Sequence, residues 1–238
     1  VSGPANGSLT LNADGSLSYT PNANLNGTDS FTYRANDSTL DSSIATVSIT
    51  VHAVNDAPVA DDQAIVTDED AAVAITLTGS DVDGGALSYA VTPLSGPAHG
   101  VLSGVAPNLT YTPHANYNGP DSFTFKANDS ALDSNIATVS ITVNAVNDTP
   151  VADDQNAATN EDTALAVTLT GSDIDGDSLT YSVVAMPSNG VLSGVAPNLT
   201  YTPNANYTGP DSFTFKANDV MVNSNIATVT VNVQPVND

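Results

Sequence analysis

The sequence predicts an all-β protein built from tandem two-sheet sandwiches. Two observations support this prediction. A ten-residue stretch recurs almost unchanged, as VNDAPVADDQ at residues 54–63 and VNDTPVADDQ at residues 146–155, so the second copy begins 92 residues after the first (146 − 54). Between the copies, apolar residues alternate with Thr and Ser, which is the period of a half-buried strand. A repeat of this length indicates domains in tandem, each large enough to bury its own core.

The repeat divides the chain into three parts. Residues 55–146 and 147–238 are complete copies, and VND at residues 236–238 matches the start of a further one. Residues 1–54 match only the second half of the unit, since Tyr19 corresponds to Tyr111 and Phe31 to Phe123. We therefore expect residues 1–54 to be the C-terminal half of a truncated repeat. Such a half would expose an apolar face, so either it is a fragment of a longer fibre or a neighbouring chain supplies the missing strands.

Seven short strands are expected in each complete repeat. In the first complete copy they cover residues 64–66, 73–77, 87–91, 100–102, 109–111, 123–126 and 136–143. Turn-forming residues such as Asp83-Gly84-Gly85 separate them, and no segment has a helical period. Seven strands in about 90 residues is the count of an immunoglobulin-like sandwich of two antiparallel sheets. The fold expected is thus a row of seven-stranded immunoglobulin-like sandwiches arranged end to end.

The composition excludes several classes of partner. The chain has 26 acidic residues against 3 basic ones and a net charge of −23, which excludes nucleic acid and anionic membrane surfaces. It has no Cys, so no disulfide or zinc–thiolate site can stabilise it. No apolar run is long enough to span a bilayer, so no membrane insertion is expected in this segment.

Several carboxylates recur at equivalent positions in the two complete repeats. Glu occurs only at Glu69 and Glu161, once in each complete repeat; it suits bidentate binding of Ca²⁺, or else it caps or solubilises an edge strand. Asp81-Val82-Asp83-Gly84 and Asp173-Ile174-Asp175-Gly176 place two carboxylates after a strand, where Gly lets both face one ion. The other interpretation of these segments is a plain Asp-Gly turn. They are not EF-hand loops, because the Gly and Glu of that motif would fall at other positions.

Five motifs occur in a fixed order within one period. In the last repeat they begin at Glu161, Leu169, Phe215, Ile226 and Val236, and they read EDT, LTGSDIDGDSLTY, FKAND, IATVTVNV and VND. In this form and order they resemble the cadherin repeat in its bacterial form, which recurs many times in large surface adhesins. The resemblance covers the whole chain. It implies Ca²⁺ bound at the joints between neighbouring repeats.

Carried over position by position, the resemblance implies three ligand sets. One joint would use Glu69, Asn147, Asp148, Asp173, Asp175 and Asp219. The joint before it would use Asn55, Asp56, Asp81, Asp83 and Asp129, and the set at the end of the chain comprises Glu161, Asn237 and Asp238. Asp121 and Asp211 are weaker additional candidates. Ala53 and Ala145 stand where the family has an acid, and Ala57 and Thr149 where it has Asn, so one or two ions are expected at each joint.

No group of residues predicts catalysis. His52, His99 and His114 occupy non-equivalent positions with no partner spacing, and no nucleophile motif is present, so the chain is not expected to be an enzyme. The first functional hypothesis is a spacer of a secreted or surface adhesin, bacterial and extracellular, whose joints are made rigid by Ca²⁺ and which supports cell adhesion or a biofilm matrix. The alternative is a calcium-dependent module that binds polysaccharide or another adhesin. The expected partners are calcium ions, neighbouring repeats, other copies of the fibre and cell-surface polysaccharide.

Overall fold

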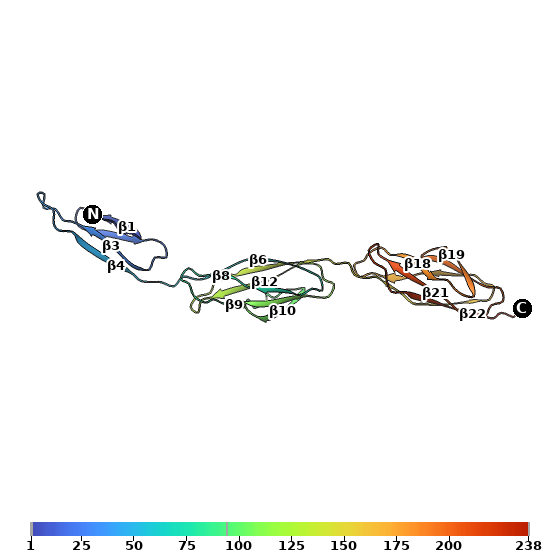
Figure 1. Cartoon of the computed structure of the whole chain (residues 1–238). Helices are drawn as coiled ribbons and strands as arrows, with labels where there is room; N and C mark the ends of the chain where they lie inside the picture. Colours follow the sequence, from blue (N-terminus) through green and yellow to red (C-terminus); the bar gives the residue numbers. More distant parts are fainter. Residues whose placement is uncertain (1, 94, 238) are drawn as a thin grey trace. The chain divides into compact units, whose positions relative to one another are not determined.

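All regular structure in the described part of the chain is β, as the sequence predicts (Figure 1). The computed structural model describes residues 2–93 and 95–237. The chain forms two compact units, residues 1–144 and 145–238. The first unit contains the half repeat and the first complete repeat, and the second unit contains the second complete repeat.

The first complete repeat is a sandwich of a four-stranded and a three-stranded sheet. The four-stranded sheet has the order β6-β13-β12-β9, the three-stranded sheet has the order β10-β11-β7, and β5 pairs with β8 at one end. The bounds are β5 (Val59–Ala60), β6 (Gln63–Asp68), β7 (Val73–Thr76), β8 (Gly79–Ser80), β9 (Ser88–Val91), β10 (Gly100–Val105), β11 (Asn108–Pro113), β12 (Gly119–Asn128) and β13 (Ala137–Asn144). The seven predicted strands are therefore all present, and the β5–β8 pair is additional.

The second complete repeat has the same topology. Its sheets have the orders β15-β22-β21-β18 and β16-β20-β19, with β14 paired to β17. The bounds are β14 (Val151–Ala152), β15 (Gln155–Asn160), β16 (Leu165–Thr168), β17 (Gly171–Ser172), β18 (Thr180–Ala185), β19 (Gly190–Val195), β20 (Asn198–Pro203), β21 (Gly209–Asn218) and β22 (Ala227–Gln234).

One pairing corrects the expectation of two purely antiparallel sheets. β6 runs parallel to β13, from Gln63 opposite Val139 to Asp68 opposite Asn144, and β15 pairs with β22 in the same way. Each repeat therefore begins at one end of its sandwich, and its last strand ends at the other. The alternation of apolar residues could not reveal this, because strand direction leaves the period of two unchanged.

The core lies between the two sheets and follows the alternation of the strands. Along β13, Ala137, Val139, Ile141 and Val143 are buried between exposed or half-buried polar residues. Tyr111 from β11 and Phe125 from β12 are fully buried in the same cluster. The second complete repeat has an equivalent core around Tyr201 and Phe215.

The half repeat consists of two separate hairpins. β1 (Gly7–Leu11) pairs with β2 (Leu17–Pro21), and β3 (Gly27–Tyr33) pairs with β4 (Ala45–Val51). Phe31 is buried, but Tyr33 is 40% exposed, whereas its counterpart Phe125 is 0% exposed. The exposed apolar face expected for this segment is present.

Candidate metal centres

The Asp-x-Asp-Gly segment of the second unit folds into a tight acidic loop directly after β17. Asp175 N–H donates to Asp173 Oδ1 at 2.9 Å, and Gly176 completes the turn with a φ of +80° that favours glycine. Carboxylate oxygens of Asp173, Asp175 and Asp177 lie within 4.8 Å of one another. Asp177 was not among the predicted ligands. Its position directly after Asp-x-Asp-Gly could have indicated it as a ligand, and the first unit has Gly85 at the equivalent position.

The joint residues Asn147 and Asp148 are fixed to this loop and to a second one. Asp148 N–H donates to Asp175 Oδ2 at 2.7 Å. Asn147 Nδ2 donates to Asp219 Oδ2 at 2.9 Å and to the carbonyl oxygen of Asp148 at 2.7 Å. Asp219 Oδ1 accepts hydrogen bonds from two backbone N–H groups of the turn that follows it. The structure therefore brings five of the six residues predicted for this joint together at one end of one domain.

The first unit repeats the arrangement bond for bond. Asn55 Nδ2 donates to Asp129 Oδ2 at 2.7 Å, and Asp56 N–H donates to Asp83 Oδ2 at 2.6 Å. Asp83 N–H in turn donates to Asp81 Oδ1 at 2.8 Å. The five residues predicted for this joint are thus gathered in one place as well. The same geometry in two copies indicates that the sequence of the repeat specifies it.

Hydrogen bonds lower the pKa of Asp129 and Asp219, the two carboxylates that accept from the joint asparagines. The pKa of Asp129 lies below its ordinary value, chiefly because Leu132 N–H donates to it and next because Asn55 does. The pKa of Asp219 is lowered in the same way, by Val222 N–H first and then by Asn147. Asp173 Oδ2 is buried, and none of the described residues donates a hydrogen bond to it. A buried carboxylate oxygen without a donor is a favourable position for a cation.

The two glutamates lie at the other end of their domains, beside the last strand. Glu69 N–H donates to Asn144 O, and Glu161 N–H donates to Gln234 O, both at 2.9 Å. Glu161 Oε1 also accepts a hydrogen bond from Val236 N–H at 2.7 Å, one residue before Asn237. Asp238 lies outside the described residues. Glu69 belongs to the first unit and the Asp173 loop to the second, so its contribution to that joint stays a prediction.

Comparison with known families identifies the repeats. Residues 55–142 and 147–232 each match the bacterial Ig domain, and together they make up more than half of the chain. The chain belongs to the bacterial Ig domain family. Residues 1–53 match the bacterial cadherin-like domain. The repeats seen in the sequence are therefore bacterial Ig domains preceded by a bacterial cadherin-like segment.

The chain is also similar to one curated protein and to several solved cadherin structures. The chain is 30% identical to integrin beta-like protein A of Dictyostelium discoideum over 270 aligned residues, which cover 95% of this chain and 14% of that protein. A protocadherin gammaB7 EC3-6 structure has a TM-score of 0.58 at 16% identity, with 97% of this chain and 67% of that one covered. The protocadherin gammaB4 extracellular domain has a TM-score of 0.56 at 16% identity, with 97% and 44% covered. These structures show that the fold is cadherin-like.

The families also give the general setting of the chain. Bacterial Ig and cadherin-like domains indicate an extracellular or surface location. Domains of this type are generally non-enzymatic. Across residues 2–93 and 95–237, the structure contains no helix with the length and apolarity needed to cross a membrane.

Asp121 and Asp211 are not available as ligands, which corrects their weaker assignment. Asp121 Oδ1 accepts hydrogen bonds from Ala98 N–H and Ser122 N–H, both at 2.9 Å. Its Oδ2 accepts from His99 N–H at 3.0 Å and from the Tyr111 hydroxyl at 2.8 Å. The four acceptor positions of the carboxylate are therefore filled. Asp211 makes the same four bonds, including one from Tyr201, so each bacterial Ig domain has a buried Asp–Tyr clasp.

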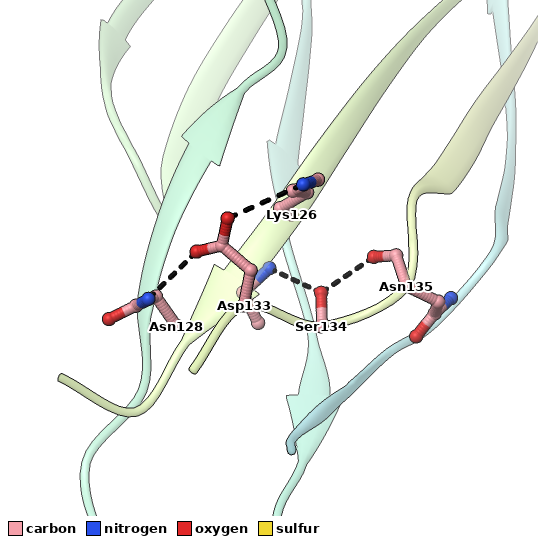
Figure 2. Close-up of polar contacts among 6 residues, drawn as sticks. Lys126, Asn128, Asp133, Ser134 and Asn135 are labelled. Atoms are coloured by element: carbon pink, nitrogen blue, oxygen red, sulfur yellow. Dashed lines mark hydrogen bonds and ion pairs between the residues drawn. The ribbon is translucent and has the colours of Figure 1, made fainter. Parts of the chain in front are cut away.

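Two of the three basic side chains, Lys126 and Arg34, form ion pairs away from the acidic loops. Figure 2 shows Lys126 Nζ directed at Asp133, with Nζ and Oδ2 3.3 Å apart, while Asn128 Nδ2 donates to the other oxygen at 2.7 Å. Arg34 makes the equivalent pair with Asp41 at 3.5 Å. Neither of these two ion pairs involves a metal-site candidate.

Proposed function

We propose that the chain is a spacer segment of an extracellular adhesin and that Ca²⁺ bound at its acidic loops makes the joints rigid. The observation that supports this most directly is the duplicated loop geometry, in which joint residues are hydrogen-bonded to carboxylates from two separate loops. The oxygen atoms that could coordinate an ion belong to carboxylates, side-chain amides and the backbone, and these are the ligands that Ca²⁺ prefers. Asp173 Oδ2, buried without a donor among the described residues, also fits a cation.

Charge explains why an ion would stabilise the joint residues. Two carboxylates about 4 Å apart repel each other by roughly 1 kcal/mol in water and by about 4 kcal/mol at an effective dielectric constant of 20. Asp173, Asp175 and Asp177 form such a group, and a divalent cation would turn this repulsion into attraction. The joint residue Asp148 is already hydrogen-bonded to Asp175, so an ion that orders the loop also orders the joint.

The glutamate of the preceding repeat completes the proposal. Glu69 would supply a further ligand to the Asn147–Asp148 joint, as the resemblance to cadherin repeats implies. Extracellular modules of this kind bind Ca²⁺ with dissociation constants of roughly 10⁻⁴ to 10⁻³ M, so the millimolar calcium outside cells would occupy such sites. The near-identity of the two complete repeats suits a spacer, whose purpose is length.

Small-angle scattering and thermal unfolding in millimolar Ca²⁺ and in excess chelator test the proposal. Calcium should narrow the distribution of interdomain distances and raise the melting temperature. Asp173→Asn with Asp175→Asn should weaken both effects, and adding Asp81→Asn with Asp83→Asn should abolish them, because each unit has one such loop. Asp14→Asn with Asp61→Asn removes the same charge as the first pair at exposed positions outside the predicted ligand sets and should leave both effects intact. Identical profiles with and without Ca²⁺ would contradict the proposal and favour a binding module instead.

A further inference from the structure

His99 and His114 flank the β10–β11 hairpin and are joined by a backbone hydrogen bond, a pairing that their spacing in the sequence did not indicate. The β10–β11 ladder ends with Gly100 opposite Pro113, and His99 and His114 directly precede and follow these two residues. His114 N–H donates to His99 O at 2.8 Å. Directly opposite residues of an antiparallel pair project to the same face, with Cβ atoms about 4.5–5.5 Å apart. Gly100 and Pro113 are buried, whereas His99 and His114 are both exposed, so both imidazoles project outward at this end of the hairpin.

The surroundings hold this pair in place. His99 N–H donates to Asp121 Oδ2, so the buried Asp–Tyr clasp fixes its backbone. The His99 ring stacks on Tyr117, with ring centroids 4.1 Å apart and planes 3° from parallel. Tyr117 is itself fixed, since its hydroxyl donates to Pro120 O at 2.7 Å and its N–H to His114 O at 3.1 Å. A fixed ring loses less entropy when it binds a ligand.

The fold does not require histidine at either position. The equivalent pair is Asn189 and Asn204 in the second complete repeat, and Asn6 and Asn22 in the half repeat, and both pairs make the same backbone bond at 2.9 Å. The strands between the pair are identical letter for letter, at residues 100–113 and 190–203. Both asparagines are thus replaced together by histidine in one repeat, while the structure around them is kept.

We propose that His99 and His114 form a binding site for a late first-row transition-metal dication, of which Zn²⁺, Ni²⁺ and Cu²⁺ are the members. Neutral imidazole is a preferred ligand of these ions. The site is chemically distinct from the oxygen-rich loops at the joints, which suit Ca²⁺. Water would complete the coordination.

The other repeats supply the matched control for a calorimetric test. Zn²⁺ would be titrated into the full chain in millimolar Ca²⁺, which occupies the carboxylate loops. His99→Asn with His114→Asn recreates the pair already present in the second complete repeat, so it should fold and melt as the wild type does. Two ligands on one scaffold bind as a chelate, so the double variant should bind Zn²⁺ at least about tenfold more weakly. His52→Asn, which matches Asn144 at the equivalent position, should bind as the wild type does.

Three results would overturn the site. The first is that the wild type and the double variant bind Zn²⁺ with equal affinity. The second is that His52→Asn loses binding, and the third is that further Ca²⁺ displaces Zn²⁺. A gain-of-site variant sharpens the test, because Asn189→His with Asn204→His places the same pair opposite each other in the second complete repeat. It should bind a second Zn²⁺ per chain, and a stoichiometry still equal to that of the wild type would contradict the claim that this cross-strand position creates the site. The scattering response to Ca²⁺ should be unchanged in all variants, so the outcome is independent of the proposed spacer function.

Discussion

Two carboxylates at opposite ends of β12 have contrasting surroundings. Asp121, near the start of the strand, is buried and accepts four hydrogen bonds from its own domain. Asp129, just past the end of the strand, accepts two from its turn and one from the joint residue Asn55. The first carboxylate has no acceptor position left for a ligand, and the second does. The hydrogen-bond partners of a carboxylate, and not its place in a repeat, therefore decide whether it can bind an ion.

The largest expected effect comes from removing the saturated carboxylate. Asp121→Ala would leave the Tyr111 hydroxyl and three backbone N–H groups without their acceptor, and Tyr111 is fully buried. We expect a loss of about 3 kcal/mol in the free energy of unfolding, because buried donors without a partner are costly. Urea unfolding followed by circular dichroism measures it. Asp61→Ala, at an exposed position, should change stability by less than about 0.5 kcal/mol. Equal effects of the two substitutions would contradict the claim that the hydrogen bonds of Asp121 stabilise the fold.

A slightly smaller effect is expected from filling the space beside the clasp. A Cβ at Gly100 would collide with the ring of Tyr111, which has no room to move. Gly100→Ala should therefore destabilise the repeat by about 2 kcal/mol, as overpacking of a core does. Gly96→Ala is the control, since a Cβ there meets nothing within 4 Å. Both variants would be compared by the same urea unfolding, and a neutral Gly100→Ala would show that the clasp is loosely packed.

Acid should weaken the clasp in a defined direction. Burial alone would raise the pKa of Asp121, but hydrogen bonds from Tyr111, Ala98 and Ser122 together bring it below its ordinary value. A lowered pKa in the folded state gives stability above about pH 4 that is lost as the pH falls through the folded value. Tyr111→Phe removes one of these bonds and should cost about 1 kcal/mol at pH 7. Its difference from the wild type in thermal melting should shrink towards pH 2, and a difference that widens would contradict the assignment.

The smallest effect is expected at an exposed ion pair. Lys126 and Asp133 lie 3.3 Å apart, with side chains 37% and 56% exposed. The pKa of Asp133 is lowered first by Asn128 and only then by Lys126. Lys126→Ala should thus cost less than about 0.5 kcal/mol, and less still in high salt. Thermal unfolding at two salt concentrations measures this effect. A loss above about 1 kcal/mol would contradict the expectation that an exposed ion pair contributes little to stability.

The sequence by itself determined the features that depend on short-range pattern. The recurrence at residues 54–63 and 146–155 gave the repeat, and alternation gave the seven main strands of each copy. The Asp-x-Asp-Gly turns were predicted directly after a strand from the residues themselves, and their place at the joint was implied by the resemblance to cadherin repeats. These features are local, since side-chain period and turn chemistry depend on neighbouring residues.

Only the tertiary structure decided which distant residues meet. It showed β6 parallel to β13, the two-residue β5–β8 pair, the saturation of Asp121 and the cross-strand pair of His99 and His114. Each depends on the register between strands that are far apart in the chain or on hydrogen bonds from several elements at once. A one-dimensional pattern does not specify such pairings, because every register that keeps the apolar face buried satisfies the same alternation.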